Sequence, residues 1–334
     1  MQRIKIALII LLIALLTVLG LYAFLNRITD TQLDKQPDAN GYYVIDDLGN
    51  KVYLPHKPMR IMTTQIYLDN MVLGLVEEER VISVSRNMDS LGDSFIDGKI
   101  LKIPYRITTP PLETVLKLAP DLLIVHDLIG REQIECYRQI GIPVYVSKIA
   151  NNIPEVQHAI RGIATVVGES ARGEVLLAKM DKILARVVQN IPDELAFSQK
   201  SVLVAANHSF YGGKDCMYDD ICKRAKVQNG VADLGVSNGQ LISKEVMIEV
   251  DPDYFLLSKH WPTDAKKDSA LIRGFSADKS FRDLQAIKLG HVRTIDNKYV
   301  FVGHQNCVWS VQKLASIVYG SRIPLEQEEF LKGF

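Results

Sequence analysis

Three histidines, His208, His260 and His304, each follow a different predicted strand in the second half of the chain. Because parallel strands present their carboxyl ends at one edge of a sheet, these imidazoles are expected to lie near one another. Neutral imidazole is a common ligand of transition metals, so they could bind iron, either within haem or directly. No His-x-x-x-His spacing accompanies them, and a loop histidine is often only a polar surface group, so no firm metal site is predicted. The remaining histidines are expected to be structural or exposed: His56, His126, His158 and His291.

Other polar and aromatic side chains also follow predicted strands in both halves of the chain. Arg86 and Arg106 could each pair with two oxygens of a carboxylate or catecholate, although loop arginines are commonly solvated or paired nearby. Tyrosine and tryptophan rings could stack on a flat or macrocyclic ligand, although a tyrosine ring is often only packing. The ligand-binding candidates are Thr64, Gln65, Tyr67, Arg86, Tyr105, Arg106, His208, Tyr211, His260, Trp261 and His304. Trp309 lies within a helical pattern and is expected in the core.

One long helix is predicted over residues 171–191, where apolar residues recur at intervals of three and four. Ser170 or Glu169 could cap its start, and Pro192 marks its end. About twenty residues with a rise of 1.5 Å each form a rod of roughly 30 Å, about the width of a small domain. Strands alternate with helices on both sides of this rod, which is typical of parallel sheets. The expected fold class is therefore α/β, with two similar lobes joined by one rigid helix.

The two halves contain a matching segment, LETVLKLAPDLLIV from Leu112 and KEVMIEVDPDYFLL from Lys244. In each, a glutamate begins a helix, Pro-Asp follows seven residues later, and a buried strand comes next. Two copies of one lobe would give this pattern, and chance similarity is the alternative. Further along the second half, Tyr299–Val302 is expected to be a strand.

The N-terminus carries a predicted membrane segment. Arg3 and Lys5 precede an uncharged apolar run over residues 6–25, which is about long enough to cross a bilayer. A cleaved signal usually has a shorter core and a small-x-small site, so an uncleaved anchor is favoured over a cleaved peptide. No cysteine follows the run, which excludes an acylated anchor. Both readings place the body on the extracytoplasmic face of the cytoplasmic membrane, periplasmic or at the cell surface.

The predicted organisation has six segments. They are an anchor or signal (1–27), a polar tether (28–40), an N-terminal lobe (41–150), connecting helices including the rod (151–197), a C-terminal lobe (198–320) and a tail (321–334).

Composition excludes several classes of protein. Lys+Arg and Asp+Glu both number 39 in 334 residues, so no bulk charge favours nucleic acid as a partner. No Gly-x-Gly-x-x-Gly, Gly-x-Ser-x-Gly or His-Glu-x-x-His motif occurs, so no enzyme activity is expected. Four cysteines are too few for a disulfide framework. Cys136 is expected to be buried, and Cys216 and Cys222 are close enough in sequence to form a disulfide in an oxidising compartment.

Taken in order, several segments resemble the extracytoplasmic solute-binding proteins of ABC importers for iron-siderophores, haem and cobalamin. They are DDLGNKVYLPHKPMRIM, LETVLKLAPDLLIV, IGIPVYV, the rod, ISKEVMIEVDPDYFLL and LQAIKLGHVRTID, and together they cover about residues 42–320. The resemblance implies two Rossmann-like lobes with mostly parallel sheets and a ligand cleft between them. It also implies that Glu113 and Glu245, one on each lobe, form salt bridges with arginines of the permease.

The resemblance thus implies a membrane-anchored receptor that binds a ferric siderophore, haem or cobalamin without a covalent bond. Its partners would be an ABC permease dimer and, through it, the ATPase, with residues 6–25 in the membrane. Two alternatives remain. A zinc or manganese receptor shares the two-lobe form but needs several His and carboxylate ligands across the cleft. A membrane-tethered sensor could keep the fold without feeding a permease.

Overall fold

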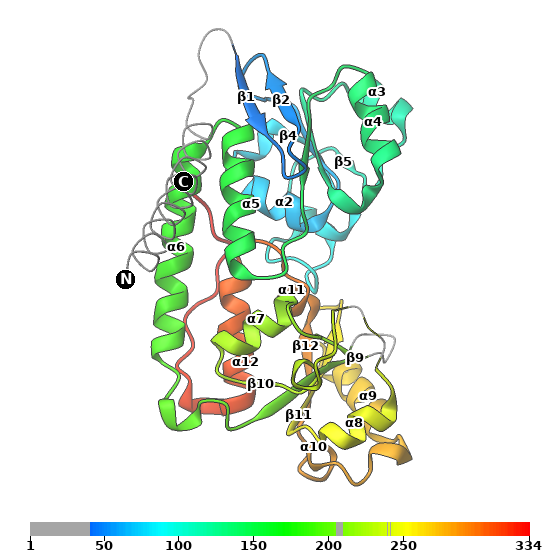
Figure 1. Ribbon diagram of the computed structural model, residues 1–334, viewed down its shortest axis with the longest axis vertical. Coiled ribbons are helices and arrows are strands. Elements are labelled where there is room, and N and C mark those ends of the chain that lie inside the picture. Colours follow the sequence, from blue (N-terminus) through cyan, green and yellow to red (C-terminus); the bar gives the residue numbers. More distant parts are fainter. Residues whose placement is uncertain (1–40, 205–209, 239, 241) are drawn as a thin grey trace, which may run out of the picture.

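The computed structural model describes residues 41–204, 210–238, 240 and 242–334 (Figure 1). The predicted anchor, the predicted tether and His208 lie outside the described residues. Within the described ranges, no helix combines the length and the hydropathy needed to cross a membrane.

The first lobe contains a β-hairpin and a five-stranded parallel sheet. The hairpin pairs β1 (Tyr42–Ile45) with β2 (Lys51–Leu54). The sheet has the order β5-β4-β3-β6-β7. Its strands are β3 (Ile61–Thr63), β4 (Val81–Val84), β5 (Tyr105–Arg106), β6 (Leu122–His126) and β7 (Val144–Ser147). The apolar side chains of β3, β6 and β7 are buried on both faces, because helices cover both sides of the sheet.

Two pairs of helices cover the first sheet. One face packs against α3 (Leu112–Leu118) and α4 (Arg131–Gln139). The other face packs against α2 (Ile66–Leu73) and α5 (Ile153–Val166). Of these helices, α2, α3 and α4 each connect successive strands, as in other parallel α/β sheets, whereas α5 leads from β7 to the rod.

The second lobe repeats this arrangement. Its parallel strands have the order β10-β8-β11-β12, and β9 pairs with β8 in the antiparallel sense. The strands are β8 (Lys200–Val204), β9 (Phe210–Tyr211), β10 (Gln228–Asn229), β11 (Tyr254–Lys259) and β12 (Val292–Asp296). One face packs against α8 (Lys244–Val250), α9 (Ala265–Ser276) and α10 (Gln285–Lys288). The other face packs against α7 (Met217–Arg224) and α12 (Cys307–Tyr319).

The rod is α6 (Ser170–Gln189), which runs along one side of both lobes (Figure 1). Its apolar stripe is buried against α5 beside the first lobe and against α12 beside the second. Burying a side chain such as Leu176 contributes about 1.5 to 3 kcal/mol, so the stripe ties both lobes to one core. The predicted two-lobe α/β fold with one connecting rod is confirmed. The buried residues of the stripe are Gly173, Leu176, Leu177, Met180, Ile183 and Val187.

The segment predicted as a tail is packed against the rest of the protein. Residues 323–334, here called the C-terminal strap, run back along α6 from the second lobe to the first (Figure 1). Three basic residues of α6, spaced two helical turns apart, bind the strap. Arg186 pairs with the Glu326 carboxylate at 2.8 Å, Lys179 donates to the carbonyl of Lys332 at 2.7 Å, and Arg172 lies 4.5 Å from the centre of the Phe334 ring.

The end of the strap reaches the first lobe. The Gly333 amide donates to the carbonyl of Gly74 at 2.8 Å, and Leu331 is buried. Gln305 donates to the carbonyls of both Leu331 and Asn70, at 3.2 and 2.7 Å. The strap therefore links the second lobe, the rod and the first lobe.

Several local predictions have clear outcomes. Trp309 is buried, as predicted. The strand expected over Tyr299–Val302 is wrong, because α11 (Asn297–Val300) occupies the start of that segment. The expectation that Cys136 is buried is also wrong, because it lies on the exposed face of α4. Cys216 and Cys222 are free thiols here, not a disulfide.

Candidate functional site

The carboxyl edges of the two sheets face each other and are in contact. The hydroxyl of Ser90, in the segment after β4, donates to the carbonyl of His260, which directly follows β11, at 2.7 Å. The amide of Lys298, which follows β12, donates to the carbonyl of Gly92 at 2.9 Å. In open α/β sheets, ligands bind at the carboxyl ends of the strands. These opposed edges, here called the interlobe edge, are therefore the candidate binding site.

A buried polar cluster supports the first lobe's side of this edge. Asp69 of α2 is fully buried and accepts hydrogen bonds from the Ser85 amide at 2.9 Å, the Ser85 hydroxyl at 2.5 Å and the Thr63 hydroxyl. Burial raises the pKa of Asp69 to about 7, although these hydrogen bonds act to lower it. The neighbouring candidate Thr64 is also buried, and its hydroxyl lies 3.5 Å from the carbonyl of Ile124. These residues shape the loops and are not open to a ligand.

Gln65 and His126 come together at the ends of β3 and β6. The side-chain nitrogens Nε2 of Gln65 and Nε2 of His126 are 3.3 Å apart. Burial lowers the pKa of His126, so its imidazole is neutral at pH 7. Its Nδ1 atom is buried without a hydrogen-bond partner in the part of the chain that the structure describes. His126 was expected to be structural or exposed, although it is the last residue of a buried strand, a position typical of binding sites in α/β sheets.

The two candidate arginines differ sharply. Arg106 pairs with Asp89 at 2.9 Å and donates to the carbonyls of Ile103 and Gly98 at 2.7 and 2.6 Å. Its guanidinium is therefore occupied in holding the loops of the first lobe. Arg86 is exposed, and its only side-chain hydrogen bond to a described residue is from Nε to the carbonyl of Arg106, at 3.4 Å. Of the two, Arg86 keeps donors available for an anionic ligand.

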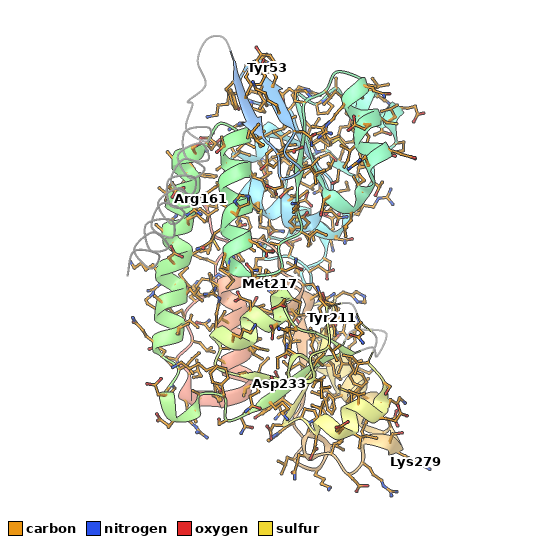
Figure 2. All side chains as sticks on the ribbon, in the orientation of Figure 1. Tyr53, Arg161, Tyr211, Met217, Asp233 and Lys279 are labelled. Carbon is orange, nitrogen blue, oxygen red and sulfur yellow. The ribbon has the colours of Figure 1, made fainter. Side chains whose placement is uncertain are left out.

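The candidate aromatic residues also separate into buried and exposed groups. The Tyr67 ring is packed in the main core, so it is not open to stack on a ligand. Tyr105 is 43% exposed at the first lobe's edge. Tyr211 lies on the side of the second lobe that faces the first (Figure 2), in edge-to-face contact with Phe301 at 5.1 Å. Phe301 is 42% exposed and was missed because its segment was expected to be a strand.

The two candidate histidines among the described residues differ in exposure. His304 is 2% exposed and packs against Phe95, and burial lowers its pKa to about 3. His260 is exposed, with its ring 5.2 Å from that of Trp261. His208 lies outside the described residues, so of the two candidate histidines that the structure places, only His260 has an accessible imidazole. No group of three or more His, Cys, Asp or Glu side chains suited to a metal ion occurs in the described ranges.

A hollow of about 740 Å³ adjoins the first lobe's edge, between the hairpin turn, the loops after β6 and β7, and α5. Asp47 lies in its wall, accepts from the Lys148 amide at 2.9 Å and pairs with His158 at 3.4 Å. Burial would raise the pKa of Asp47, but its hydrogen bonds outweigh burial and lower it. The same pairing raises the pKa of His158. Since its lining includes Asp127 and Ile149, the hollow continues the interlobe edge.

Glu113 and Glu245 occupy matching places on the two lobes. Each lies exposed in the first turn of a seven-residue helix, α3 or α8, where an acid is favoured by the helix dipole. A hydrogen bond with the Ser243 side chain lowers the pKa of Glu245, which is fully exposed. Both side chains are therefore accessible to a partner.

Comparison with known proteins gives a family match. The sequence model of a family described as periplasmic binding protein matches residues 99–299. A search of curated proteins finds no match.

Solved structures with the same fold are numerous. A periplasmic binding protein from Veillonella parvula has a TM-score of 0.70 and 15% identity, over 84% of this chain and 98% of that one. The periplasmic haem-binding protein RhuT from Roseiflexus sp. RS-1, in its apo form, has a TM-score of 0.67 and 18% identity, over 79% and 99%. CeuE from Helicobacter pylori, with Ni(II) bound, has a TM-score of 0.66 and 17% identity, over 84% and 89%. At these identities the likeness establishes the fold alone.

Proposed function

Since the chain belongs to the periplasmic binding protein family, we propose that it is the solute-binding component of an ABC importer for a metal chelate. Members of this family are extracytoplasmic solute-binding proteins and not enzymes. The proposed ligand is a ferric siderophore, haem or cobalamin, bound between the lobes without a covalent bond. Among the structural neighbours, RhuT is a haem-binding protein, and CeuE was solved with nickel.

The observation that carries the ligand proposal is the partly exposed aromatic surface of the interlobe edge, where Tyr211 and Trp261 are half-buried. The second lobe contributes Tyr211 with Phe301, and His260 with Trp261. The first lobe contributes Tyr105. Aromatic faces stabilise flat or macrocyclic ligands by stacking and by burial of apolar area. A site of this kind suits a tetrapyrrole or an aromatic chelate better than a small, strongly hydrated ion.

Two polar groups would orient such a ligand. Arg86 can donate two parallel hydrogen bonds to a carboxylate or catecholate oxygen pair. His260 presents an exposed imidazole, which could coordinate haem iron. His304 is enclosed in the core and would need a local opening to reach any ligand.

Delivery would use the two exposed acids. We expect Glu113 and Glu245 to pair with arginines of a permease dimer, which passes the solute inward with energy from its ATPase. One carboxylate on each lobe gives two contacts for a roughly two-fold partner, and such rim charges mainly set association rate and orientation. The predicted anchor at residues 6–25 would hold the receptor beside the permease.

Two alternative functions are less well supported. A receptor for free zinc or manganese needs several facing ligands, and the described residues contain no such cluster. A membrane-tethered sensor would keep ligand binding without a permease, and an uptake assay separates it from the importer component.

The deciding experiment is a titration of purified residues 32–334 with haemin, cyanocobalamin and a panel of ferric siderophores. Absorbance and intrinsic fluorescence would report binding, with the Tyr211→Ala and Phe301→Ala variants compared with Tyr43→Ala on the hairpin. Submicromolar saturation by one ligand, weakened by the first two variants and unchanged by the third, is expected. No response across the panel would refute the proposal.

A further inference from the structure

Lys259 is a buried lysine at the interlobe edge. It is the last residue of β11 and is 2% exposed, although lysine is almost never buried without a partner. Its ammonium lies 2.6 Å from a carboxylate oxygen of Asp296, which is opposite it in register on β12. It also donates to the carbonyl of Trp261 at 3.1 Å and lies 3.6 Å from Asp268 of α9. Three oxygens thus surround its three N–H groups.

The same network holds the indole ring of Trp261. Asp268 accepts a hydrogen bond from the indole N–H at 3.0 Å, while Lys259 holds the Trp261 carbonyl. Trp261 is therefore fixed at both its backbone and its ring. A buried charged network is weak evidence for a stabilising role, because well-packed apolar residues in the same place often give equal or greater stability. The main effect of this network is therefore on the orientation of Trp261.

The first lobe holds the neighbouring residue. Ser90 donates to the carbonyl of His260, and Gly92 packs directly against the same peptide. A Cβ atom at position 92 would lie 2.3 Å from the carbonyl carbon of His260, so only glycine allows this approach. The backbone of residues 260 and 261 is thus held from both lobes, while the imidazole remains exposed.

We propose that Lys259 and Asp268 are positioning residues that fix Trp261, and with it His260, as a preformed contact surface for a flat conjugated ligand. The ligand part of this inference rests on the proposed function, whereas the rigidity of Trp261 does not depend on it. The two rings meet edge to face, with an angle of 80° between them. A ring held in this way loses little rotamer freedom when a ligand stacks on it, so binding is stronger than to a mobile ring.

The test measures ring mobility first and ligand affinity second. The chain has two tryptophans, so Trp309→Phe in every protein leaves Trp261 as the single reporter. In this background, fluorescence anisotropy of the ligand-free protein is compared for Lys259→Met, Asp268→Ala and Asp268→Asn. The matched control is Lys266→Met, an exposed lysine in the first turn of α9. Haemin, cyanocobalamin and a ferric tris-catecholate are then titrated against each protein.

We expect Asp268→Ala and Lys259→Met to lower the anisotropy of Trp261, while Asp268→Asn, which keeps an acceptor oxygen, restores most of it. The affinity for whichever of the three probes binds the parent should fall about three- to tenfold with the first two variants, the cost of ordering one side chain. Unchanged anisotropy in Asp268→Ala overturns the inference, and so does lowered anisotropy with unchanged affinity. If the parent binds no probe, the proposed function fails while the anisotropy still decides whether the network fixes Trp261. If Lys259→Met does not fold, the Asp268→Ala and Asp268→Asn pair still decides the outcome.

Discussion

Asp121 and Asp253 make the same contacts in the two lobes. The amide of Asp121 donates to the carbonyl of Arg60 at 3.1 Å, and its carboxylate accepts from the Arg60 amide at 2.8 Å. Asp253 makes both contacts with Lys200, at 2.9 and 2.7 Å. Each aspartate joins the start of one strand to the start of its neighbour, so the sequence echo is a structural repeat.

The residues around these aspartates match as well. The helix before each ends in a left-handed residue, Ala119 with φ of 44° and Asp251 with φ of 40°. The side chains of Arg60 and Lys200 donate to carbonyls at the ends of α3 and α8, at Leu118 and Val250. Cations at a helix C-terminus are stabilising, which explains a basic residue at both positions.

Replacing either aspartate with alanine should therefore cost a similar free energy of unfolding. We expect Asp121→Ala and Asp253→Ala each to lower the free energy of unfolding by about 1 to 3 kcal/mol, because each leaves at least one backbone N–H without its carboxylate partner. Urea unfolding measures the loss, with Asp233→Ala, an exposed aspartate away from both joints, as control. If only one of the two variants lost stability, the two aspartates would not be equivalent.

The C-terminal strap should be sensitive to a single methyl group. A Cβ atom at Gly333 would lie 2.2 Å from the carbonyl oxygen of Arg172, so Gly333→Ala should detach the end of the strap. Overpacking of this kind costs about 1 to 3 kcal/mol. Gly274→Ala is the matched control, since a Cβ there meets nothing within 4 Å. Thermal unfolding should show a lower Tm for Gly333→Ala only, and equal Tm values would show that the strap adds no stability.

The double variant Glu113→Ala with Glu245→Ala should abolish solute uptake by cells. The affinity of the purified receptor for its ligand should be unchanged. The reason is that both carboxylates are exposed and neither contacts the interlobe edge residues described above. Glu132→Ala with Glu249→Ala, two exposed acids on α4 and α8, is the control and should retain uptake. Reduced affinity with normal uptake would reject the docking role.

Asp69 should make stability fall as pH rises. Its pKa is raised from 3.8 to about 7 by burial, so the folded state binds the proton more tightly than the unfolded state. Its contribution to the free energy of unfolding is therefore greatest below pH 4 and is lost as pH rises towards about 7. The free energy of unfolding falls by at most about 1.4 kcal/mol per pH unit in this range. Urea unfolding from pH 4 to 8 should show this decline in the parent and a smaller one in Asp69→Asn. The same decline in both proteins would assign it to other groups.

One of the four cysteines should react with a thiol reagent in the native protein. Cys136 is exposed, whereas Cys216, Cys222 and Cys307 are buried. Burial raises the pKa of Cys307 to about 12 and that of Cys216 above its usual value, which removes reactive thiolate. A thiol assay should count one reactive thiol in the native state and four in denaturant. The Cys136→Ser variant should show no reactive thiol in the native state and three in denaturant. A count of two in denaturant without reductant would indicate a Cys216–Cys222 disulfide.

Local sequence patterns were enough to predict the parts of this protein that have a regular pattern along the chain. The three-and-four spacing of Leu176, Met180 and Ile183 predicted the rod, because one helical face must be apolar to be buried. The repeated Pro-Asp segments predicted two copies of one lobe. The helix pattern around Trp309 likewise predicted a core residue.

Only the tertiary structure decided which candidate side chains remain available. Arg86 and Arg106 look alike in sequence, but Asp89 and two carbonyls of its own loop occupy Arg106. His304 and His260 were both predicted to follow second-lobe strands, yet only His304 is enclosed. Whether a polar group is free depends on which distant segments pack against it, and short-range periodicity carries no information about those partners.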